Sequence, residues 1–518
     1  MSELLNIGQM LRINATKYSN NLCLQDATRR YTYSQTNARV NSLANSLTEM
    51  GLNKGDVISV LLDNCIEIVE LYLATAKNGI IINPINFRLN IEDILYIAKD
   101  CKAKAFIFGE QFRESIGKIK NQLAIKNDRF FMVGSSSDEY LNYHELIKNR
   151  ECSEPAAKIN GNDIWVLLYT SGTTGKPKGV LRDHNSYTAF YLINAGDFGF
   201  KPWHTVLNIM PLCHVNATFF SLIFTYIGGS IYIHPATRFI AEEMLELIST
   251  QKPTFISLIP THYALMLAVD ETKKSEFDVS SVKKLLCSSA PARMEHKKEI
   301  MKWFKGVELY EGYGSTEAGI VTVLAPHEQL TKQNSIGRES TGTELIKLLD
   351  ENGSAVKQGE IGELFSSGPM LFNEYLNLPE ATKTSFNGKW FSAGDMAYQD
   401  EDGYYFLVDR KHNMIITGGE HVYPSVVENI VASIDKVIDV AIIGTPHEKW
   451  GEAVTAIVIP KEPDDNDILA NEIISLCKRE LPSYACPKNI HFITEREMPR
   501  TATGKILHRI LKERYCKI

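Results

Sequence analysis

The sequence lacks an apolar run long enough to cross a membrane. Its most apolar window, Phe219–Ile233, falls short of the ~20 residues that a spanning helix needs, and Gly228 and Gly229 interrupt it. We therefore expect this window to form a buried strand or helix. We also expect no export signal, because Glu3 and Arg12 do not fit a basic start followed by an unbroken apolar segment.

An excess of basic residues is absent as well. The chain has 55 lysines and arginines against 62 aspartates and glutamates, which gives a net charge of −7, and the basic residues are scattered. A nucleic-acid partner is therefore not expected. The nine cysteines are widely spaced and include no Cys-x-x-Cys pair, which is typical of reduced thiols in a cytoplasmic protein.

What the sequence does contain is a repeated alternation of short β-rich runs and helical segments. Val57–Asp63 is β-rich, Cys65–Gly79 has helical spacing and ends at a glycine, and Ile80–Asn86 is extended again. Similar units recur further along the chain. This order predicts an α/β fold with doubly wound, mostly parallel sheets and helices on both faces.

The pattern changes after residue 409. The segment Ser425–Ile434 has helical spacing, whereas Asp439–Gly444 and Ala453–Ile459 are β-rich and follow closely. Such shorter mixed units are typical of a small α+β domain. We therefore expect a large N-terminal domain over residues 1–409 and a small C-terminal domain over residues 410–518.

The stretch YTSGTTGKPKGV, Tyr169–Val180, combines glycines, hydroxyl side chains and lysines directly after a β-rich run. Glycines let backbone N–H groups face an anion without obstruction, so this stretch predicts a phosphate-binding loop. It is not a Walker loop, because Lys176 is followed by Pro177, and GYGSTE is not a dinucleotide fingerprint, because Glu317 occupies its third glycine position. Composition alone leaves a flexible polar turn as an equal alternative.

The loop resembles the phosphate-loop signature of the adenylate-forming superfamily, which comprises acyl-CoA synthetases, adenylation domains and luciferases. Further matches follow in the order of that superfamily: PLCHV (211–215), EGYGSTEA (311–318), GELFSSGPMLFNEY (362–375), WFSAGD (390–395), DRKHNMIITGGEHVYP (409–424), GTPHEKWGE (444–452) and PRTATGK (499–505). Essentially the whole chain is covered. Its overall look is similar to small bacterial acyl-CoA ligases of the carnitine/crotonobetaine-CoA ligase type.

The resemblance implies a two-step reaction. A carboxylic acid attacks the α-phosphate of Mg-ATP to give an acyl-adenylate and pyrophosphate, and the thiol of coenzyme A then displaces AMP. Transfer to a carrier-protein thiol is an alternative, and a non-catalytic nucleotide or acyl binder is a rival class. The cofactors implied are ATP, Mg²⁺ and coenzyme A, the partner is a small carboxylic acid, and a homodimer follows only by analogy.

The resemblance also implies the residues of the nucleotide site. ATP or AMP would contact Thr170, Ser171, Gly172, Thr173, Thr174, Gly175, Lys178, Ser289, Ala290, Pro291, Glu311, Gly312, Tyr313, Gly314, Asp395 and Arg410. Glu317 is implied to hold Mg²⁺ with help from Thr170, and Thr316 to donate to the α-phosphate. Without the motif, Glu317 would be interpreted as a solvated acid at a helix start. Tyr313 is implied to stack on adenine, and Asp395 to accept from both ribose hydroxyls.

The smaller domain is implied to act as a mobile lid. Lys505 would reach the carboxylate and the α-phosphate during adenylation and be withdrawn afterwards. Asp409 matches the hinge of the superfamily, and Gly418, Gly419 and Glu420 match its coenzyme A tunnel.

The acid itself is implied to meet a separate set of residues. His214 would lie beside the carboxylate and take part in catalysis with Lys505 and Thr316, although a lone histidine is more often structural. The remaining acid pocket is implied at Asn216, His262 and Ala318.

One stretch departs from the superfamily pattern. Where many relatives have a Thr-His pair after the phosphate loop, this chain reads LRDHNSY, with Arg182 and Asp183 before His184. Asp183 either caps a helix or alters the mouth of the acid pocket. We expect this departure to affect substrate choice rather than catalysis.

Overall fold

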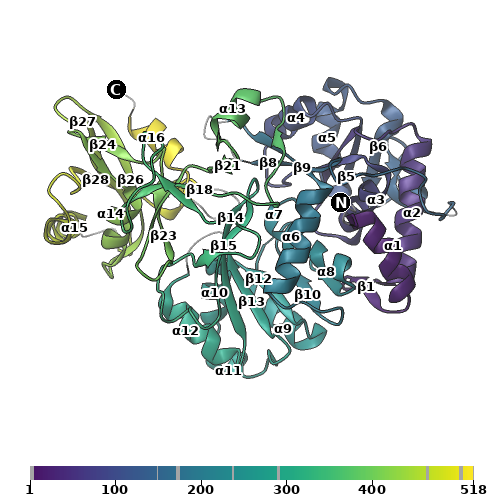
Figure 1. Ribbon diagram of the computed structural model, residues 1–518, viewed down its shortest axis with the longest axis horizontal. Coiled ribbons are helices and arrows are strands. Elements are labelled where there is room, and N and C mark those ends of the chain that lie inside the picture. Colours follow the sequence, from purple (N-terminus) through teal and green to yellow (C-terminus); the bar gives the residue numbers. More distant parts are fainter. Residues whose placement is uncertain are drawn as a thin grey trace. The chain divides into compact units, whose positions relative to one another are not determined.

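The computed structural model describes residues 5–148, 150–170, 176–235, 238–288, 292–462, 466–500 and 506–516. The chain forms two compact units, whose elements are labelled in Figure 1. The larger unit consists of Met1–Ile346 and Ser366–Phe391, and the smaller unit of Lys347–Phe365 and Ser392–Ile518. The predicted boundary after residue 409 falls in β23 (Tyr405–Arg410), inside the smaller unit. That a mobile domain begins after residue 409 stays a prediction.

An eight-stranded sheet forms one part of the larger unit, in the order β19–β9–β8–β4–β3–β5–β6–β7. Its strands are β3 (Val57–Leu61), β4 (Ile81–Pro84), β5 (Ala105–Gly109), β6 (Phe130–Val133), β7 (Leu141–Asn142), β8 (Ile164–Thr170), β9 (Lys178–Asp183) and β19 (Glu374–Tyr375). The strands from β8 to β7 pair in parallel, whereas β9 is antiparallel to both of its neighbours.

A nine-stranded sheet forms another part, in the order β16–β15–β14–β13–β12–β10–β11–β1–β2. Its strands are β1 (Leu22–Gln25), β2 (Arg30–Thr32), β10 (Thr205–Asn208), β11 (Ser230–Ile233), β12 (Phe255–Leu258), β13 (Lys284–Ser288), β14 (Glu308–Ser315), β15 (Gly319–Leu324) and β16 (Arg338–Glu339). The strands from β14 to β1 in this order pair in parallel, whereas β2 is antiparallel to β1, β15 to β14 and β16 to β15. The prediction of mostly parallel sheets is therefore confirmed.

Helices alternate with the parallel strands, as the sequence predicts (Figure 1). They are α1 (Ile7–Lys17), α2 (Tyr33–Glu49), α3 (Ile66–Asn78), α4 (Ile91–Asp100), α5 (Arg113–Ile119), α6 (His184–Asp197), α7 (Val215–Phe220), α8 (Leu222–Ile227), α9 (Ala241–Gln251), α10 (Pro260–Leu267), α11 (Glu271–Lys274) and α12 (Met294–Trp303). Every residue of α3 is buried, which explains its mostly apolar sequence. It ends at Gly79 in the left-handed conformation, with a φ of 77°.

The most apolar window contains both kinds of buried element that we expected. It covers the end of α7, all of α8 and β11, and Gly228 ends α8 with a φ of 94°. Among the described residues, no helix is both long enough and apolar enough to cross a membrane.

The segment Ser366–Phe391 rejoins the larger unit after the chain has entered the smaller one. It contains β19, α13 (Pro379–Thr384), β20 (Phe386–Asn387) and β21 (Trp390–Phe391). Pairing of β19 with β9 places this segment beside the strand that follows the phosphate loop.

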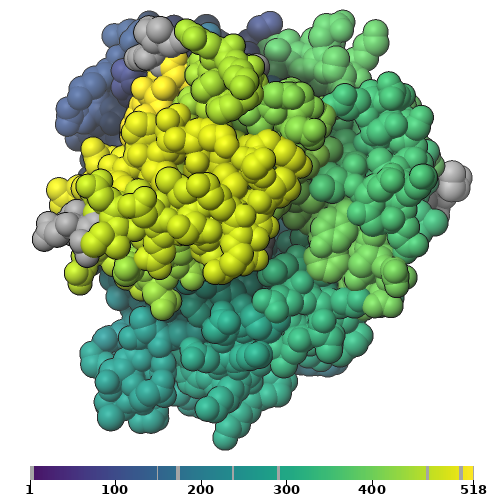
Figure 2. All heavy atoms as spheres, turned by 90° about the vertical axis from the view of Figure 1, so that its left-hand side faces the viewer, coloured from purple at the N-terminus to yellow at the C-terminus, as the bar shows by residue number. Residues whose placement is uncertain are grey.

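The smaller unit has the expected α+β character. One sheet has the order β17–β18–β22–β23, and another has the order β25–β24–β27–β26 with β28 beside β27. The other bounds are β17 (Lys347–Leu349), β18 (Gly362–Phe365), β22 (Asp395–Gln399), β24 (Ile415–Thr417), β25 (Glu420–Val422), α14 (Pro424–Ala432), β26 (Val437–His447), β27 (Gly451–Pro460), α15 (Asn466–Glu480), β28 (Asn489–Phe492) and α16 (His508–Tyr515). The smaller unit has a core of its own, which includes Ile415, Val427, Ile442 and Val458, and its C-terminal residues are yellow in Figure 2.

Candidate active site

The predicted phosphate loop connects the antiparallel strands β8 and β9. Thr170 ends β8, Lys178 begins β9, and the two are register partners. The predicted cradle residues between them lie outside the described residues, namely Ser171, Gly172, Thr173, Thr174 and Gly175. Lys178 Nζ lies 5.4 Å from the centre of the Tyr375 ring, whereas Lys176 Nζ lies 5.3 Å from the ring of Tyr96. The two lysines therefore have different surroundings.

Tyr375 links Lys178 to Glu317. Its hydroxyl donates to Glu317 Oε1 at 2.9 Å, and Glu317 itself lies in the turn between β14 and β15. The backbone of that turn is held as well, because Phe372 N donates to Glu317 O at 2.7 Å. The structure thus brings the predicted phosphate lysine and the predicted magnesium ligand to one tyrosine.

The donors around Glu317 fit a magnesium ion that arrives with a nucleotide. Among the described residues, no group of three or more His, Cys, Asp or Glu side chains could hold a metal ion. Mg²⁺ is commonly held by one or two carboxylates together with phosphate oxygens and waters. Glu317 is partly exposed, so its carboxylate is accessible for such a role.

Glu311 is engaged by neighbouring protein groups. Lys297 Nζ on α12 donates to Glu311 Oε2 at 2.5 Å, and Ala292 N donates to Glu311 Oε1 at 3.2 Å. Burial raises the pKa of Glu311, and the contact with Lys297 opposes this shift. The carboxylate therefore fixes Ala292, which directly follows the predicted adenine-loop residues Ser289, Ala290 and Pro291; these three lie outside the described residues.

The other predicted nucleotide residues of this motif lie on β14 or just after it. Gly312, Tyr313 and Gly314 belong to the strand, and Thr316 to the turn. A Cβ atom added at Gly314 would lie 1.9 Å from the carbonyl oxygen of Gly319. Glycine is therefore required where β14 and β15 approach each other.

Two of the predicted acid-pocket residues are histidines that are neutral at pH 7. His214 precedes α7, and its Nε2 lies 3.4 Å from Asn86 Nδ2. Burial, aided by the charge of Arg88, lowers the pKa of His214 to about 4, and the same two causes lower the pKa of His262 to about 4. The His262 ring stacks on Phe239 with 4.1 Å between ring centres.

Asn216 joins the carboxyl ends of two parallel strands. Its Nδ2 donates to Ser288 Oγ at 2.7 Å, and Ser257 Oγ donates to its Oδ1 at 3.0 Å. Ser257 lies in β12 and Ser288 ends β13, so α7 begins at the edge of the sheet where ligands of α/β proteins bind. Ala318 is buried beside the Thr316–Glu317 turn.

In the smaller unit, Asp395 and Arg410 are neighbours on β22 and β23. They are register partners, and Arg410 Nε donates to Asp395 Oδ1 at 2.5 Å. Asp409 Oδ1 accepts from Arg410 N at 2.6 Å, and Asp409 Oδ2 accepts from Ser425 N at 2.8 Å. The predicted hinge residue therefore ties the end of β23 to the start of α14.

The predicted coenzyme A residues form the hairpin between β24 and β25. Gly418 and Gly419 have φ values of 61° and 88°, which favour glycine, and Gly418 N donates to Trp450 O at 2.8 Å. A Cβ atom at Gly419 would meet no described heavy atom within 4 Å, and Glu420 is exposed. Lys505 lies outside the described residues.

Sequence reasoning gave no site role to Arg182, Tyr375 or Lys297. Tyr375 is the last residue of the motif GELFSSGPMLFNEY, and Lys297 belongs to an ordinary amphipathic helix, so neither carried a signal of its own. Arg182 carried a signal, because the stretch LRDHNSY departs from the superfamily pattern. Its companion Asp183 is a helix cap, as one of our two alternatives proposed, since its side chain accepts from Ser186 N at 2.8 Å.

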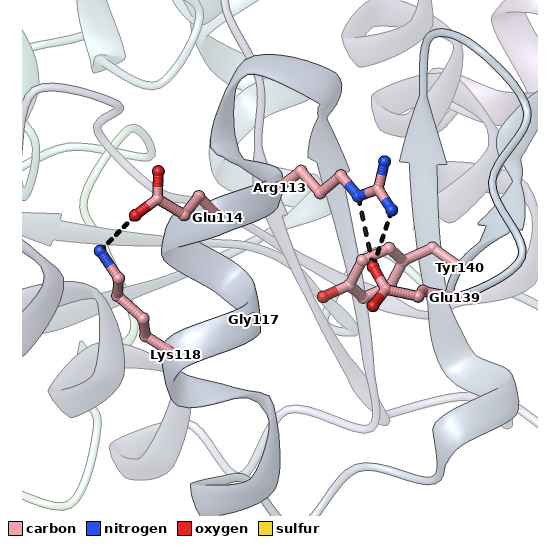
Figure 3. Close-up of a pocket in the computed structure, with 6 residues that line it drawn as sticks. All are labelled: Arg113, Glu114, Gly117, Lys118, Glu139 and Tyr140. Atoms are coloured by element: carbon pink, nitrogen blue, oxygen red, sulfur yellow. Dashed lines mark hydrogen bonds and ion pairs between the residues drawn. The ribbon is translucent and has the colours of Figure 1, made fainter.

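A surface hollow of about 400 Å³ lies elsewhere on the larger unit, over α5 (Figure 3). It is lined by Arg113, Glu114, Gly117, Lys118, Glu139 and Tyr140. The charged groups pair with one another, with Arg113 Nη2 at 2.9 Å from Glu139 Oε2 and Lys118 Nζ at 2.7 Å from Glu114 Oε1. None of the predicted site residues lines this hollow.

Comparison with known proteins identifies the family. Residues 11–376 match the model of the AMP-binding enzyme family, and residues 426–505 match the model of the AMP-binding enzyme C-terminal domain. The chain is 32% identical over 515 residues to the long-chain-fatty-acid–CoA ligase FadD13 of Mycobacterium tuberculosis, covering 98% of each chain. It is 30% identical to a feruloyl-CoA synthase of an Amycolatopsis species, covering 93% of this chain and 94% of the relative.

Solved structures give the same result. The anthranilate CoA ligase AuaEII in complex with anthranoyl-AMP superposes with a TM-score of 0.88 at 28% identity, covering 100% of this chain and 98% of that one. The o-succinylbenzoate CoA synthetase MenE of Bacillus subtilis, with its acyl-adenylate intermediate, superposes with a TM-score of 0.85 at 26% identity, covering 100% of both chains. The chain belongs to the AMP-binding, adenylate-forming enzyme family. The predicted class, an AMP-forming acid–CoA ligase that uses ATP, Mg²⁺ and coenzyme A, is confirmed.

Proposed function

We propose that the Lys178–Tyr375–Glu317 group serves the first half-reaction of this ligase, in which a carboxylic acid becomes an acyl-adenylate. A carboxylate oxygen bonds to the α-phosphorus of ATP, and the bond from that phosphorus to the bridging oxygen breaks, so that pyrophosphate leaves. In the second half-reaction the coenzyme A sulfur bonds to the acyl carbon. AMP leaves with the carboxylate oxygen, and the thiol proton passes to solvent.

The observation that carries this proposal is the shared tyrosine. Lys178 supplies an ammonium over the Tyr375 ring, and the hydroxyl of the same ring orients the Glu317 carboxylate. An ammonium neutralises phosphate charge, and a carboxylate can hold Mg²⁺. Glu317 and Thr170 would hold the ion, which when bound stabilises negative charge on phosphate oxygens. An ammonium and a carboxylate that contact the same tyrosine therefore suit the phosphates of ATP and their magnesium ion.

The proposed role of His214 depends on its neutral state. Burial lowers the pKa of His214 to about 4, so at pH 7 the imidazole carries no charge. A neutral imidazole can donate one hydrogen bond to the carboxylate of the acid without forming an ion pair. The carboxylate would then be oriented but not over-stabilised before it attacks the phosphate.

The remaining roles follow the superfamily pattern. Thr316 donates to the α-phosphate, Tyr313 stacks on adenine, and Asp395 accepts from the ribose hydroxyls with Arg410 beside it. Lys505 stabilises negative charge during adenylation only. Gly418 and Gly419 leave room for the pantetheine chain of coenzyme A, since Gly419 is open on its Cβ side.

The identity of the acid is the finer part of the proposal. By their printed names, the relatives above are a long-chain-fatty-acid–CoA ligase, a feruloyl-CoA synthase, an anthranilate CoA ligase and an o-succinylbenzoate CoA synthetase. An acid with a quaternary ammonium group stays a prediction, which would require an aromatic cage around that group. In this chain Asn216 takes the place of an acidic anchor, so an α-amino acid would lack a partner for its ammonium.

One panel of acids tests function and substrate together. Purified protein is incubated with ATP, Mg²⁺ and coenzyme A and with fatty, aryl, dicarboxylic and quaternary-ammonium acids in turn, and AMP release is measured. We expect at least one class to release AMP, with coenzyme A preferred over a phosphopantetheinyl carrier protein. Release with the carrier protein alone would transfer the proposal to the alternative acceptor, and no release with any acid would contradict it.

We also propose a cellular location and an oligomeric state for the enzyme. All nine cysteines are free, which suits a reducing compartment, and we propose a cytoplasmic location. A homodimer is proposed by analogy, and light scattering of the purified chain tests it.

A further inference from the structure

Arg182 is a buried arginine that interacts electrostatically with the carboxylates of Asp183 and Glu317 but forms no ion pair with either among the described residues. It lies in β9, its residue exposure is 0%, and it is among the largest fully buried side chains of the chain. Buried arginines are normally paired with an acid, because an isolated buried charge is costly. In the part of the chain that the structure describes, no aspartate or glutamate forms an ion pair with it.

Its guanidinium instead donates to three backbone carbonyl groups. Nη1 donates to Thr316 O at 2.6 Å and to Glu317 O at 3.2 Å, and Nη2 donates to Met370 O. Two segments that are far from β9 in sequence are therefore fastened to one side chain. Both belong to the larger unit, as does β9.

Aromatic rings cover the remaining face of the guanidinium. Its Cζ lies 5.0 Å from the centre of the Phe219 ring and 5.4 Å from that of Tyr187. These rings give some cation–π stabilisation, but Arg182 Nε is buried without a partner. An apolar side chain of similar volume would often be as stable at a buried position, so packing alone does not account for an arginine here.

The target of these hydrogen bonds is the turn that carries the proposed magnesium ligand. Glu317 O also accepts from Phe372 N, and Glu317 Oε1 accepts from Tyr375. Arg182 and the segment 370–375 thus hold the turn from two sides, by backbone and by side chain. A carboxylate on a turn fixed in this way needs little reorganisation when the nucleotide arrives.

We propose that Arg182 is a positioning residue that fixes the Thr316–Glu317 turn so that Glu317 faces the magnesium ion of ATP. The inference rests on the proposed role of Glu317. It does not make Arg182 a catalytic residue, because its hydrogen bonds go to carbonyl groups of the protein. It also gives a reason for the departure LRDHNSY that the sequence could not supply.

The test compares the binding of two nucleotides by calorimetry, without turnover. Wild type, Arg182→Met and Arg182→Lys are titrated with ATP in excess Mg²⁺ and, separately, with AMP in the presence of a chelator. For Arg182→Met we expect affinity for Mg-ATP to fall by about tenfold or more, as for other residues that orient metal ligands. Affinity for AMP should fall by less, because AMP keeps the proposed contact of its phosphate with Thr316 but brings no magnesium ion to Glu317. Arg182→Lys keeps the charge but not the fork of donors, so an intermediate loss is expected.

A control variant removes a second guanidinium, which is only partly buried. Arg39 on α2 pairs with the fully buried Glu70, and neither contacts the Thr316–Glu317 turn in any described hydrogen bond. Arg39→Met should lower stability without changing the ratio of the two nucleotide affinities. If Arg182→Met is insoluble, Arg182→Lys is used with hydrogen–deuterium exchange of residues 312–322, where faster exchange than in wild type is expected.

The possible outcomes are distinct. Equal losses of affinity for Mg-ATP and AMP, or unchanged affinity for Mg-ATP, would overturn the inference while leaving the proposed function intact. Unchanged exchange at residues 312–322 in Arg182→Lys would also overturn it. Failure of the wild type to bind Mg-ATP at all would overturn the proposed function and the inference together.

Discussion

A buried ion pair holds one segment of the candidate site in place. Glu311 and Lys297 form an ion pair in which side-chain exposures are 12% and 2%, and Glu311 also accepts from Ala292 N. A buried pair of this kind contributes little by itself, but removing one partner leaves the other charge unpaired. The pair therefore matters most for the shape of the segment that follows the predicted adenine loop.

Lys297→Met should destabilise the protein strongly. The Glu311 carboxylate would remain buried without its cation, and we expect the free energy of unfolding at pH 7 to fall by about 3–5 kcal/mol. Urea denaturation measures this loss. The double variant Lys297→Met/Glu311→Gln is the control, because it removes both charges; if it is as unstable as the single variant, the loss is not due to the unpaired charge.

Neutral buried histidines make the larger unit sensitive to acid. The His184 ring stacks on Trp165 at 5.5 Å, and neither of its ring nitrogens has a hydrogen-bond partner among the described atoms. Burial lowers the pKa of His184 to about 4. The unfolded chain therefore takes up the proton first, so stability is full above about pH 6.5 and is lost as the pH falls toward 4.

His184→Phe should flatten this pH dependence. At pH 5 the linkage amounts to about 2 kcal/mol for one such histidine, and phenylalanine can keep the stack on Trp165 without titrating. We expect the variant to lose less stability than wild type between pH 7 and pH 5 in urea denaturation. An identical loss in both proteins would show that His184 does not titrate as described.

Contacts between residues that are close in sequence were predictable, whereas contacts between distant residues were not. The cap at Asp183 is local, three residues from its partner Ser186, and was open to prediction. The partners of Arg182 lie 134 and 188 residues away and are backbone carbonyls, which carry no side-chain signal. Glu317 was predicted from its motif, but the tyrosine that orients it depends on the pairing of β19 with β9.

At the scale of elements, the approach of β14 to β15 shapes the turn that holds Thr316 and Glu317. The register shifts between Tyr313 and Gly314. A Cβ atom at Gly314 would collide with a backbone oxygen at 1.9 Å, whereas one at Gly312 would meet the ends of the Ile320 and Leu286 side chains at 3.1 Å and 3.5 Å. The backbone cannot yield as easily as a side chain.

Gly314→Ala should therefore cost more than Gly312→Ala. We expect losses of about 1–3 kcal/mol or more for Gly314→Ala, as for other overpacked sites, and less than about 1 kcal/mol for Gly312→Ala. Thermal unfolding followed by circular dichroism compares the two variants. Equal melting temperatures would contradict this account of the turn.

The elements themselves were largely predictable. Period-two and helical patterns gave β3, α3 and the α+β character of the last part of the chain, because each element buries a recognisable apolar face. The two-residue strands β19 and β16 were not predictable, since so short a segment has no pattern of its own. No pattern in the sequence predicted the antiparallel pairing of β9 with β8 either.

At the scale of the whole molecule, the proposed cycle gives the smaller unit a role in each half-reaction. In that proposal Lys505 would act in adenylation, and the hairpin of Gly418 and Gly419 would act in thioester formation. The sequence supplied both through motif resemblance, and Lys505 lies outside the described residues. The movement that would alternate the two roles has no signature in composition or periodicity.

Lys505→Ala should separate the two half-reactions. We expect acid-dependent exchange of pyrophosphate into ATP to fall by about 100-fold or more, since a group that stabilises transition-state charge is lost. Thioester formation from a supplied acyl-adenylate should stay mostly intact. The exposed Lys478 on α15 provides the control variant Lys478→Ala, which should change neither rate, and equal loss of both steps in Lys505→Ala would contradict the proposed cycle.

The central claim is that a carboxylate oxygen becomes bonded to the α-phosphorus of ATP. An acid accepted by the enzyme is therefore prepared with ¹⁸O in its carboxylate and incubated with ATP, Mg²⁺, coenzyme A and wild-type protein. Mass spectrometry of the products should find one ¹⁸O atom in AMP and none in pyrophosphate. AMP without the label, or label in inorganic phosphate released with ADP, would contradict the account.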